Sequence, residues 1–219
     1  QALLENRAAA EADLRLLDTQ LPRSSDLRAG MGRLYDLLGQ ADSALKQYGD
    51  WLDTHPADFG RAALLNSRCW LRARLDRELN LALADCERAV EVDREDAGAH
   101  DSLGWVWLRL GDAQAARRAF DKAIRLKPLA SSYYGRAVAS LRLSLPASGA
   151  SDLADARRLD PGIDAQVRHD GFGALLGLPR HQVLGRTSQE LNLWATPHEH
   201  TRLLHAVLHR APCQVLVFE

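Results

Sequence analysis

Residues 103–128 read LGWVWLRLGDAQAARRAFDKAIRLKP, and this stretch decides the fold. Counted from Gly104, an aromatic residue follows after 3 positions, a second glycine after 7, an alanine after 12, an aromatic after 16 and a proline after 24. The same offsets run from Gly32 to Pro56. A spacing that two stretches of one chain share indicates an internal repeat, in which each copy builds the same structural unit.

The spacing fits two helices that cross closely and are joined by a tight turn. Gly104 removes a side chain where the two helices of a unit approach each other. Gly111 stands at the end of the first helix, where a left-handed residue is needed. Ala116 is the small partner on the second helix, Phe120 fills the gap to the next unit, and Pro128 ends the second helix. The other copy has Gly32, Gly39, Ala44, Tyr48 and Pro56 at the same places.

These residues and offsets resemble the tetratricopeptide repeat, a helix–turn–helix unit of about 34 residues. The resemblance implies an all-α protein, a right-handed α-solenoid of stacked helix pairs. Four units follow one another at 25–58, 59–96, 97–129 and 130–163, and residues 1–24 match the second helix of a further unit. Because a half-unit cannot bury its apolar face alone, we expect the chain to be cut from a longer protein or to be processed.

The unit at 59–96 is four residues longer than the unit before it, and the excess falls near residues 71–80. We therefore expect an extended first helix or an enlarged turn. Cys69 and Cys86 take the positions that tyrosines hold in the unit at 25–58. Those are packing positions, so both cysteines are predicted to be buried, reduced thiols that pack as small apolar side chains.

The repeat period ends after Pro161, and the tail at 164–219 differs in character. It resembles the first half of a PAS sensory domain, a pattern that falls on Phe172, Leu175, Gly177, Val183, Gly185, Arg186, Thr187, Leu191, Leu193 and Trp194. The tail is shorter than a complete PAS domain, so the resemblance implies either a truncated domain or a remnant of one that docks on the end of the solenoid. The alternative is an unrelated cap, since the ends of a solenoid need covering.

One helix in the tail is well marked. Thr196 and Glu199 form a capping box, with Pro197 at the first helical position. The helix is expected at 197–209, and the residues at 214–218 have the composition of a strand. The tail is thus predicted to be a short α+β segment.

A histidine cluster lies on the same predicted helix, at His198, His200, His205 and His209. His205 and His209 have the four-residue spacing of many metal sites. The histidine stripe lies opposite the apolar face of the helix, however, and no third ligand with an acidic neighbour is evident, so we interpret it as a solvated polar face. We predict no metal site and no cofactor.

Composition excludes several classes of protein. The formal net charge is −1, from 28 basic and 29 acidic residues, which argues against a nucleic-acid binder. The apolar runs are too short for a membrane-spanning helix, and three cysteines are too few for a disulfide scaffold. No phosphate loop or catalytic constellation is found, so no enzymatic activity is expected. Reduced thiols would fit a cytoplasmic location.

The resemblance implies that the first helices of the units line a concave groove. The family positions that face this groove fall on Arg33, Asp36, Trp70, Asp101, Trp105, Arg109, Tyr134 and Arg142. Arginines and aromatics together suit a peptide with apolar anchors and an acidic group. The competing explanation for Trp70 and Trp105 is that they pack between neighbouring units.

The sequence therefore predicts a non-enzymatic interaction module or scaffold that holds a peptide or helix of another protein in its groove. One alternative is a signalling protein in which the repeats are coupled to the PAS-like tail. Another is an accessory region of a larger enzyme. Self-association through the half-unit at 1–24 is a further expectation.

Overall fold

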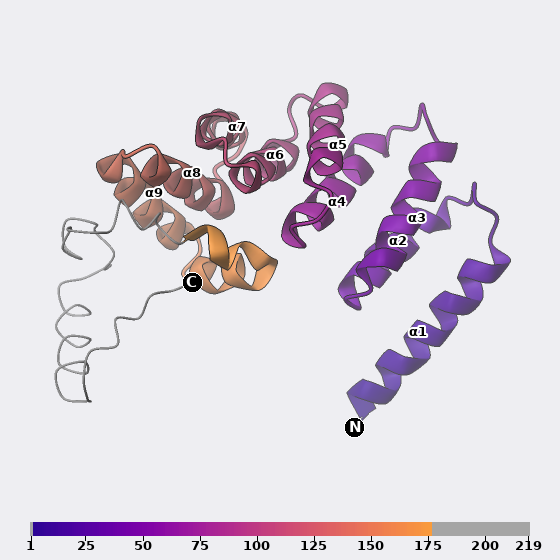
Figure 1. Cartoon of the computed structure of the whole chain (residues 1–219). Coiled ribbons are helices and arrows are strands. Elements are labelled where there is room, and N and C mark those ends of the chain that lie inside the picture. Colours follow the sequence, from indigo (N-terminus) through magenta and orange to yellow (C-terminus); the bar gives the residue numbers. More distant parts are fainter. Residues whose placement is uncertain (1, 177–219) are drawn as a thin grey trace. The chain divides into compact units, whose positions relative to one another are not determined.

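The computed structural model describes residues 2–176, which form helices and the short connections between them (Figure 1). No strand occurs in this range, and no helix in it is both long and apolar enough to cross a membrane. The helix expected at 197–209, the strand at 214–218 and the histidine cluster lie outside the described residues.

The chain divides into two compact units, Gln1–Val106 and Trp107–Glu219, within helix α6 (Ala97–Leu110). Unit 1 contains α1 (Ala2–Gln20), α2 (Leu27–Leu37), α3 (Ala41–Thr54), α4 (Arg61–Arg74), α5 (Leu79–Val92) and the first part of α6. Unit 2 contains the end of α6, α7 (Ala113–Leu126), α8 (Ala130–Arg142), α9 (Pro146–Leu159) and α10 (Ile163–Val167). A π-helical turn, η1 (Arg168–Phe172), and a 3-10 turn, η2 (Gly173–Leu176), follow α10.

Within each unit, consecutive helices pack as pairs, and each pair contacts a helix of its neighbour. In unit 1, α2 packs against α3 and α4 against α5, while α3 also contacts α4 of the next pair. In unit 2, α8 packs against α9 and also against α7 of the pair before it. The core of unit 1 is built around Tyr35, Tyr48, Trp51 and Leu52, all of them buried. The expected all-α solenoid of helix pairs is confirmed.

The repeat glycines take the roles that their spacing predicts. Gly39 and Gly111 follow the first helices of their pairs with φ values of +73° and +86°, in the region that favours glycine. A Cβ atom on Gly32 would collide with the Tyr48 ring. Phe120 of α7 reaches the next pair, since a Cβ on Gly135 of α8 would collide with the Phe120 ring.

Gly32→Ala is expected to lower the free energy of unfolding by about 1–2 kcal/mol. The added methyl collides with Tyr48, which is fully buried, and such overpacking costs roughly 1–3 kcal/mol. Gly30 lies on the same helix with nothing near its missing Cβ, so Gly30→Ala should instead stabilise the helix by up to about 1 kcal/mol. Urea unfolding followed by circular dichroism measures both. A gain of stability in both variants would contradict the close crossing of α2 and α3.

The enlarged unit keeps its first helix at ordinary length. Both α4 and α6 have 14 residues, whereas the turn after α4 spans residues 75–78 and the turn after α6 only residues 111–112. Asp76 and Glu78 in the longer turn both have positive φ. Part of the excess therefore lies in an enlarged turn.

Cys69 and Cys86 are fully buried, as predicted, but they are not reduced thiols. They form a disulfide between α4 and α5, with their Cα atoms 5.5 Å apart. That separation is typical of a disulfide, and the bond joins the two helices of one pair. The prediction of free thiols was wrong because two packing positions that face each other across a helix pair are also close enough for a bond.

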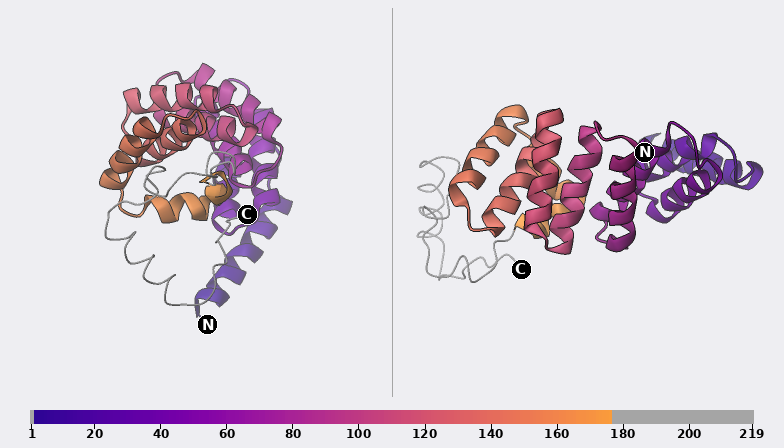
Figure 2. Two further views of the ribbon diagram at one scale, coloured as in Figure 1. Left: turned by 60° about the vertical axis from the view of Figure 1, so that its left-hand side comes forward. Right: turned by 90° about the horizontal axis from the view of Figure 1, so that it is seen from above.

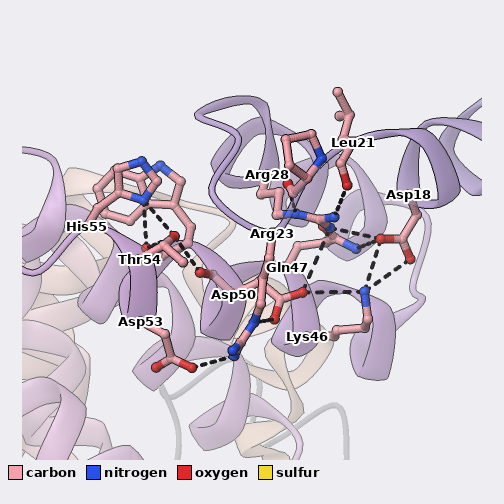
Figure 3. Close-up of polar contacts among 12 residues, drawn as sticks. Asp18, Leu21, Arg23, Arg28, Lys46, Gln47, Asp50, Asp53, Thr54 and His55 are labelled. Carbon is pink, nitrogen blue, oxygen red and sulfur yellow. Dashed lines mark hydrogen bonds and ion pairs between the residues drawn. The ribbon is translucent and has the colours of Figure 1, made fainter.

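A buried arginine fastens the end of α1 to the first helix pair (Figure 3). Arg28 is 4% exposed and donates hydrogen bonds to Asp18 (2.9 Å) and Gln47 (2.7 Å). It also donates to the main-chain carbonyl oxygens of Leu21 and Pro22. One guanidinium thus satisfies acceptors from α1, from α3 and from the connection after α1.

Asp18 is the carboxylate at the centre of this network. Burial alone would raise its pKa, but hydrogen bonds from Gln47, Arg28 and Lys46 outweigh burial and lower the pKa to about 2. The Lys46 Nζ atom lies 3.0 Å from Asp18 Oδ1. Asp18 is therefore ionised throughout the neutral range, and its charge is matched by two cations.

Candidate peptide-binding surface

In unit 1 the predicted groove residues of α2 and α4 lie on partly or fully exposed surface. Arg33 is exposed, whereas Asp36 is half-buried and forms an ion pair with Arg74 of α4. Trp70 of α4 is half-buried. This ion pair joins the first helices of two neighbouring pairs and offers an acidic and a basic group on one surface.

Asp101 and Trp105 also belong to unit 1, on the first part of α6, and both are buried. Their exposed fractions are 7% and 1%. Side chains this deep contribute to packing between helices, which fits the competing explanation for Trp105. Neither is accessible to a ligand in this structure.

In unit 2 the structure brings Arg109, Tyr134 and Arg142 together around one segment of the chain itself, residues 163–176. The segment consists of α10, η1 and η2, and α10 packs against α8 and α9 (Figure 2). Three apolar side chains anchor the segment and are at most 3% exposed, namely Ile163, Val167 and Phe172.

Two arginines hold the main chain of this segment. Arg109 at the end of α6 donates to the carbonyl oxygen of Gly171 at 2.7 Å, and its guanidinium lies 4.7 Å from the centre of the Phe172 ring. Arg142 at the end of α8 donates to the carbonyl oxygens of Leu108 (2.8 Å) and Leu175 (3.2 Å). Burial, together with the nearby charge of Arg109, lowers the pKa of Arg142. The two guanidinium groups therefore concentrate positive charge at one place.

A carboxylate at the start of the segment has its own partners. Asp164 accepts a hydrogen bond from the Tyr134 hydroxyl at 3.0 Å and two from Arg157 of α9, at 2.8 and 3.1 Å. The hydrogen bond from Arg157, supported by that from Tyr134, lowers the pKa of Asp164 against the effect of burial. Burial and the Asp164 charge in turn raise the pKa of Tyr134.

Sequence reasoning missed Arg157 and the segment. Arg157 stands on a second helix, whereas the family pattern assigns the groove to first helices, so the pattern held no signal for it. Within residues 2–176 no group of three histidine, cysteine or acidic side chains could hold a metal ion.

No family model and no curated protein matches the chain. Its helix pairs match solved structures instead, among them YrrB, described as a TPR protein with an unusual peptide-binding site. That match has a TM-score of 0.59 and 20% identity, and it covers 77% of this chain and 87% of YrrB. The fold is that of the tetratricopeptide repeat (TPR).

Two further TPR-like structures support this assignment. MamA aligns with a TM-score of 0.58 and 20% identity over 72% of this chain and 90% of its own. TTC0263, a thermophilic TPR protein of Thermus thermophilus, aligns with a TM-score of 0.58 and 19% identity over 83% of this chain and 97% of its own. At these identities the likeness concerns the fold.

The PAS-like prediction for 164–219 gains no support from these comparisons. Phe172 and Leu175, the first residues of that pattern, lie in the π-helical and 3-10 turns that pack on the TPR helices of unit 2. The rest of the pattern, from Gly177 on, lies outside the described residues.

Proposed function

We propose that the chain is a non-enzymatic TPR interaction module that binds a peptide or helix of another protein on the surface of its first helices. One observation carries the proposal: Arg109, Tyr134 and Arg142, which the TPR resemblance assigns to the groove, all contact the chain's own segment at 163–176 in unit 2. The peptide-binding site named for YrrB, a protein of similar fold, supports the same conclusion.

The chemistry of the surface suits peptides. Arginine donates several hydrogen bonds in a fixed geometry to main-chain carbonyls or carboxylates, and aromatic side chains supply buried area at little entropic cost. In unit 1, Arg33, Asp36 and Trp70 are partly or fully exposed on α2 and α4, and Asp36 pairs with Arg74 of α4. Asp101 and Trp105 support α6 from within the core and are left out of the proposed binding set.

Panning a random-peptide phage library against the full chain tests the proposal. Peptides for the unit 1 surface should bind the natural chain. Peptides for the unit 2 surface should bind the variant Phe172→Ala, whose own segment has lost its buried aromatic anchor. Arg33→Glu/Trp70→Ala should abolish binding at the unit 1 surface, and Arg109→Ala/Arg142→Ala should abolish it in unit 2.

A matched control carries two substitutions of the same type on a second helix. Arg118 and Arg125 are exposed on α7, so Arg118→Ala/Arg125→Ala should leave peptide binding unchanged. Circular dichroism confirms that every variant is folded. Peptides that bind all variants equally would place recognition away from the first helices and contradict the proposal.

The Cys69–Cys86 disulfide bears on where the protein works. Reduced thiols would fit the cytoplasm, but these two cysteines are bonded to each other. Structural disulfides persist mainly in oxidising compartments. We therefore propose that the protein works in such a compartment. No observation within residues 2–176 favours the PAS-coupled or enzyme-associated alternatives.

A further inference from the structure

The segment at 163–176 is held in unit 2 in the way a bound peptide would be held. Its apolar side chains Ile163, Val167 and Phe172 are buried, while its main chain is bonded by arginines from two first helices. Because these contacts combine apolar anchors, a carboxylate and carbonyl groups, the segment displays the ligand chemistry that the surface selects.

Two features of the segment define that chemistry. Asp164 is the acidic group, which accepts hydrogen bonds from Tyr134 and Arg157. Phe172, eight residues further on, is the aromatic anchor, and its ring stacks against the Arg109 guanidinium. Between them Gly171 has φ of +84°, a left-handed conformation that interrupts the helical geometry directly before Phe172.

We propose that the unit 2 surface recognises a partner peptide with an acidic residue followed, eight residues later, by an aromatic residue directly after a glycine. Residues 163–176 occupy the surface as an internal competitor that such a peptide displaces. This inference rests on the proposed function and names its ligand class and its regulation. With an internal competitor, the apparent Kd for a partner equals the intrinsic Kd divided by the fraction of molecules whose surface is open.

A synthetic, fluorescently labelled peptide of residues 160–176 tests the inference in fluorescence anisotropy titrations of the full chain. The natural chain should bind it weakly, because its own segment competes. Phe172→Ala removes a buried aromatic from the segment and should therefore bind the added peptide at least about tenfold more tightly. Gly171→Val releases the segment by backbone strain instead and should act in the same direction.

Two controls tie the binding to the chemistry. Adding Arg109→Ala/Arg142→Ala to the Phe172→Ala chain should abolish binding of the peptide. A peptide with Asp164→Ala and Phe172→Ala should not bind any variant. Circular dichroism of each chain confirms that the TPR helices remain folded.

Equal affinity of the natural chain and of the Phe172→Ala and Gly171→Val chains for the peptide would overturn the inference, since the segment would then not compete. If the released chain dimerises in size-exclusion chromatography and binds no added peptide, a second copy fills the surface, which also overturns it. Failure of the 160–176 peptide alongside successful phage panning would overturn the ligand class and leave the proposed function standing. Failure of both would remove the proposed function as well.

Discussion

Arg28→Met should lower the free energy of unfolding by about 3 kcal/mol. The substitution keeps the length and apolar stem of the side chain but leaves Asp18, Gln47 and two main-chain carbonyls without their shared donor. Removing one partner from a buried ion pair costs roughly 3–5 kcal/mol. We expect the lower end, because Asp18 is about a quarter exposed and keeps its bonds to Lys46 and Gln47. Urea unfolding at neutral pH measures the loss.

Arg23 provides the matched control. It pairs with Asp50 and Asp53 close to the same network, but its side chain is 61% exposed. Exposed ion pairs contribute little to stability, so Arg23→Met should lower the free energy of unfolding much less than Arg28→Met does. Equal losses in Arg28→Met and Arg23→Met would contradict the role assigned to the buried guanidinium.

Acid should destabilise the natural chain and the Arg28→Met variant to different extents. The pKa of Asp18 is about 2 in the folded protein, against its ordinary value of 3.8. A lowered pKa stabilises the fold above the ordinary value, and this stabilisation is lost as the pH falls from about 4 to about 2. Arg28→Met removes one of the bonds that lower this pKa, so the variant should lose less stability than the natural chain over that interval.

Reducing the Cys69–Cys86 disulfide should destabilise the chain by about 3 kcal/mol. The two cysteines are 17 residues apart, and opening a loop near this size returns about that much conformational entropy to the unfolded chain. Because both sulfur atoms are buried, reduction requires unfolding first. Urea transitions recorded with and without a phosphine reductant should therefore differ in midpoint.

Thiol titration checks the bond itself. In denaturant without reductant, the chain should expose one reactive thiol, that of Cys213, and three after reduction. Cys69→Ala/Cys86→Ala should unfold like the reduced chain and should no longer respond to the reductant. Three reactive thiols in the untreated, purified protein would contradict the disulfide and the oxidising compartment proposed from it.

The helix pairs could be predicted because their spacing encodes local geometry. Gly39 and Gly111 had to take positive φ where the first helices end, and Gly32 had to admit the Tyr48 ring. Each of these requirements involves residues within one unit. The repeat period of the sequence is therefore enough to predict the helix pairs and the turns within them.

The occupied surface could not be predicted in the same way. The contacts of Arg109 with Gly171 and of Arg142 with Leu175 join residues 62 and 33 positions apart, and the segment they hold lies beyond the last complete unit. The burial of Trp105 also depends on packing that a position in the repeat does not specify. The disulfide, by contrast, could have been predicted. Cys69 and Cys86 take the positions of Tyr35 and Tyr48 in the preceding unit, one on each helix of a pair, which places the two cysteines opposite each other.

We propose that the first helices of the TPR pairs bind peptides, in unit 2 through Arg109, Tyr134 and Arg142. The most direct test is a heteronuclear NMR titration of the isotope-labelled Phe172→Ala chain with the tightest-binding peptide that panning enriches in unit 2. We predict the largest shift changes at Arg109, Tyr134 and Arg142 and at their neighbours on α6 and α8. Changes concentrated on the second helices, α7 and α9, with α6 and α8 unaffected, would contradict the claim.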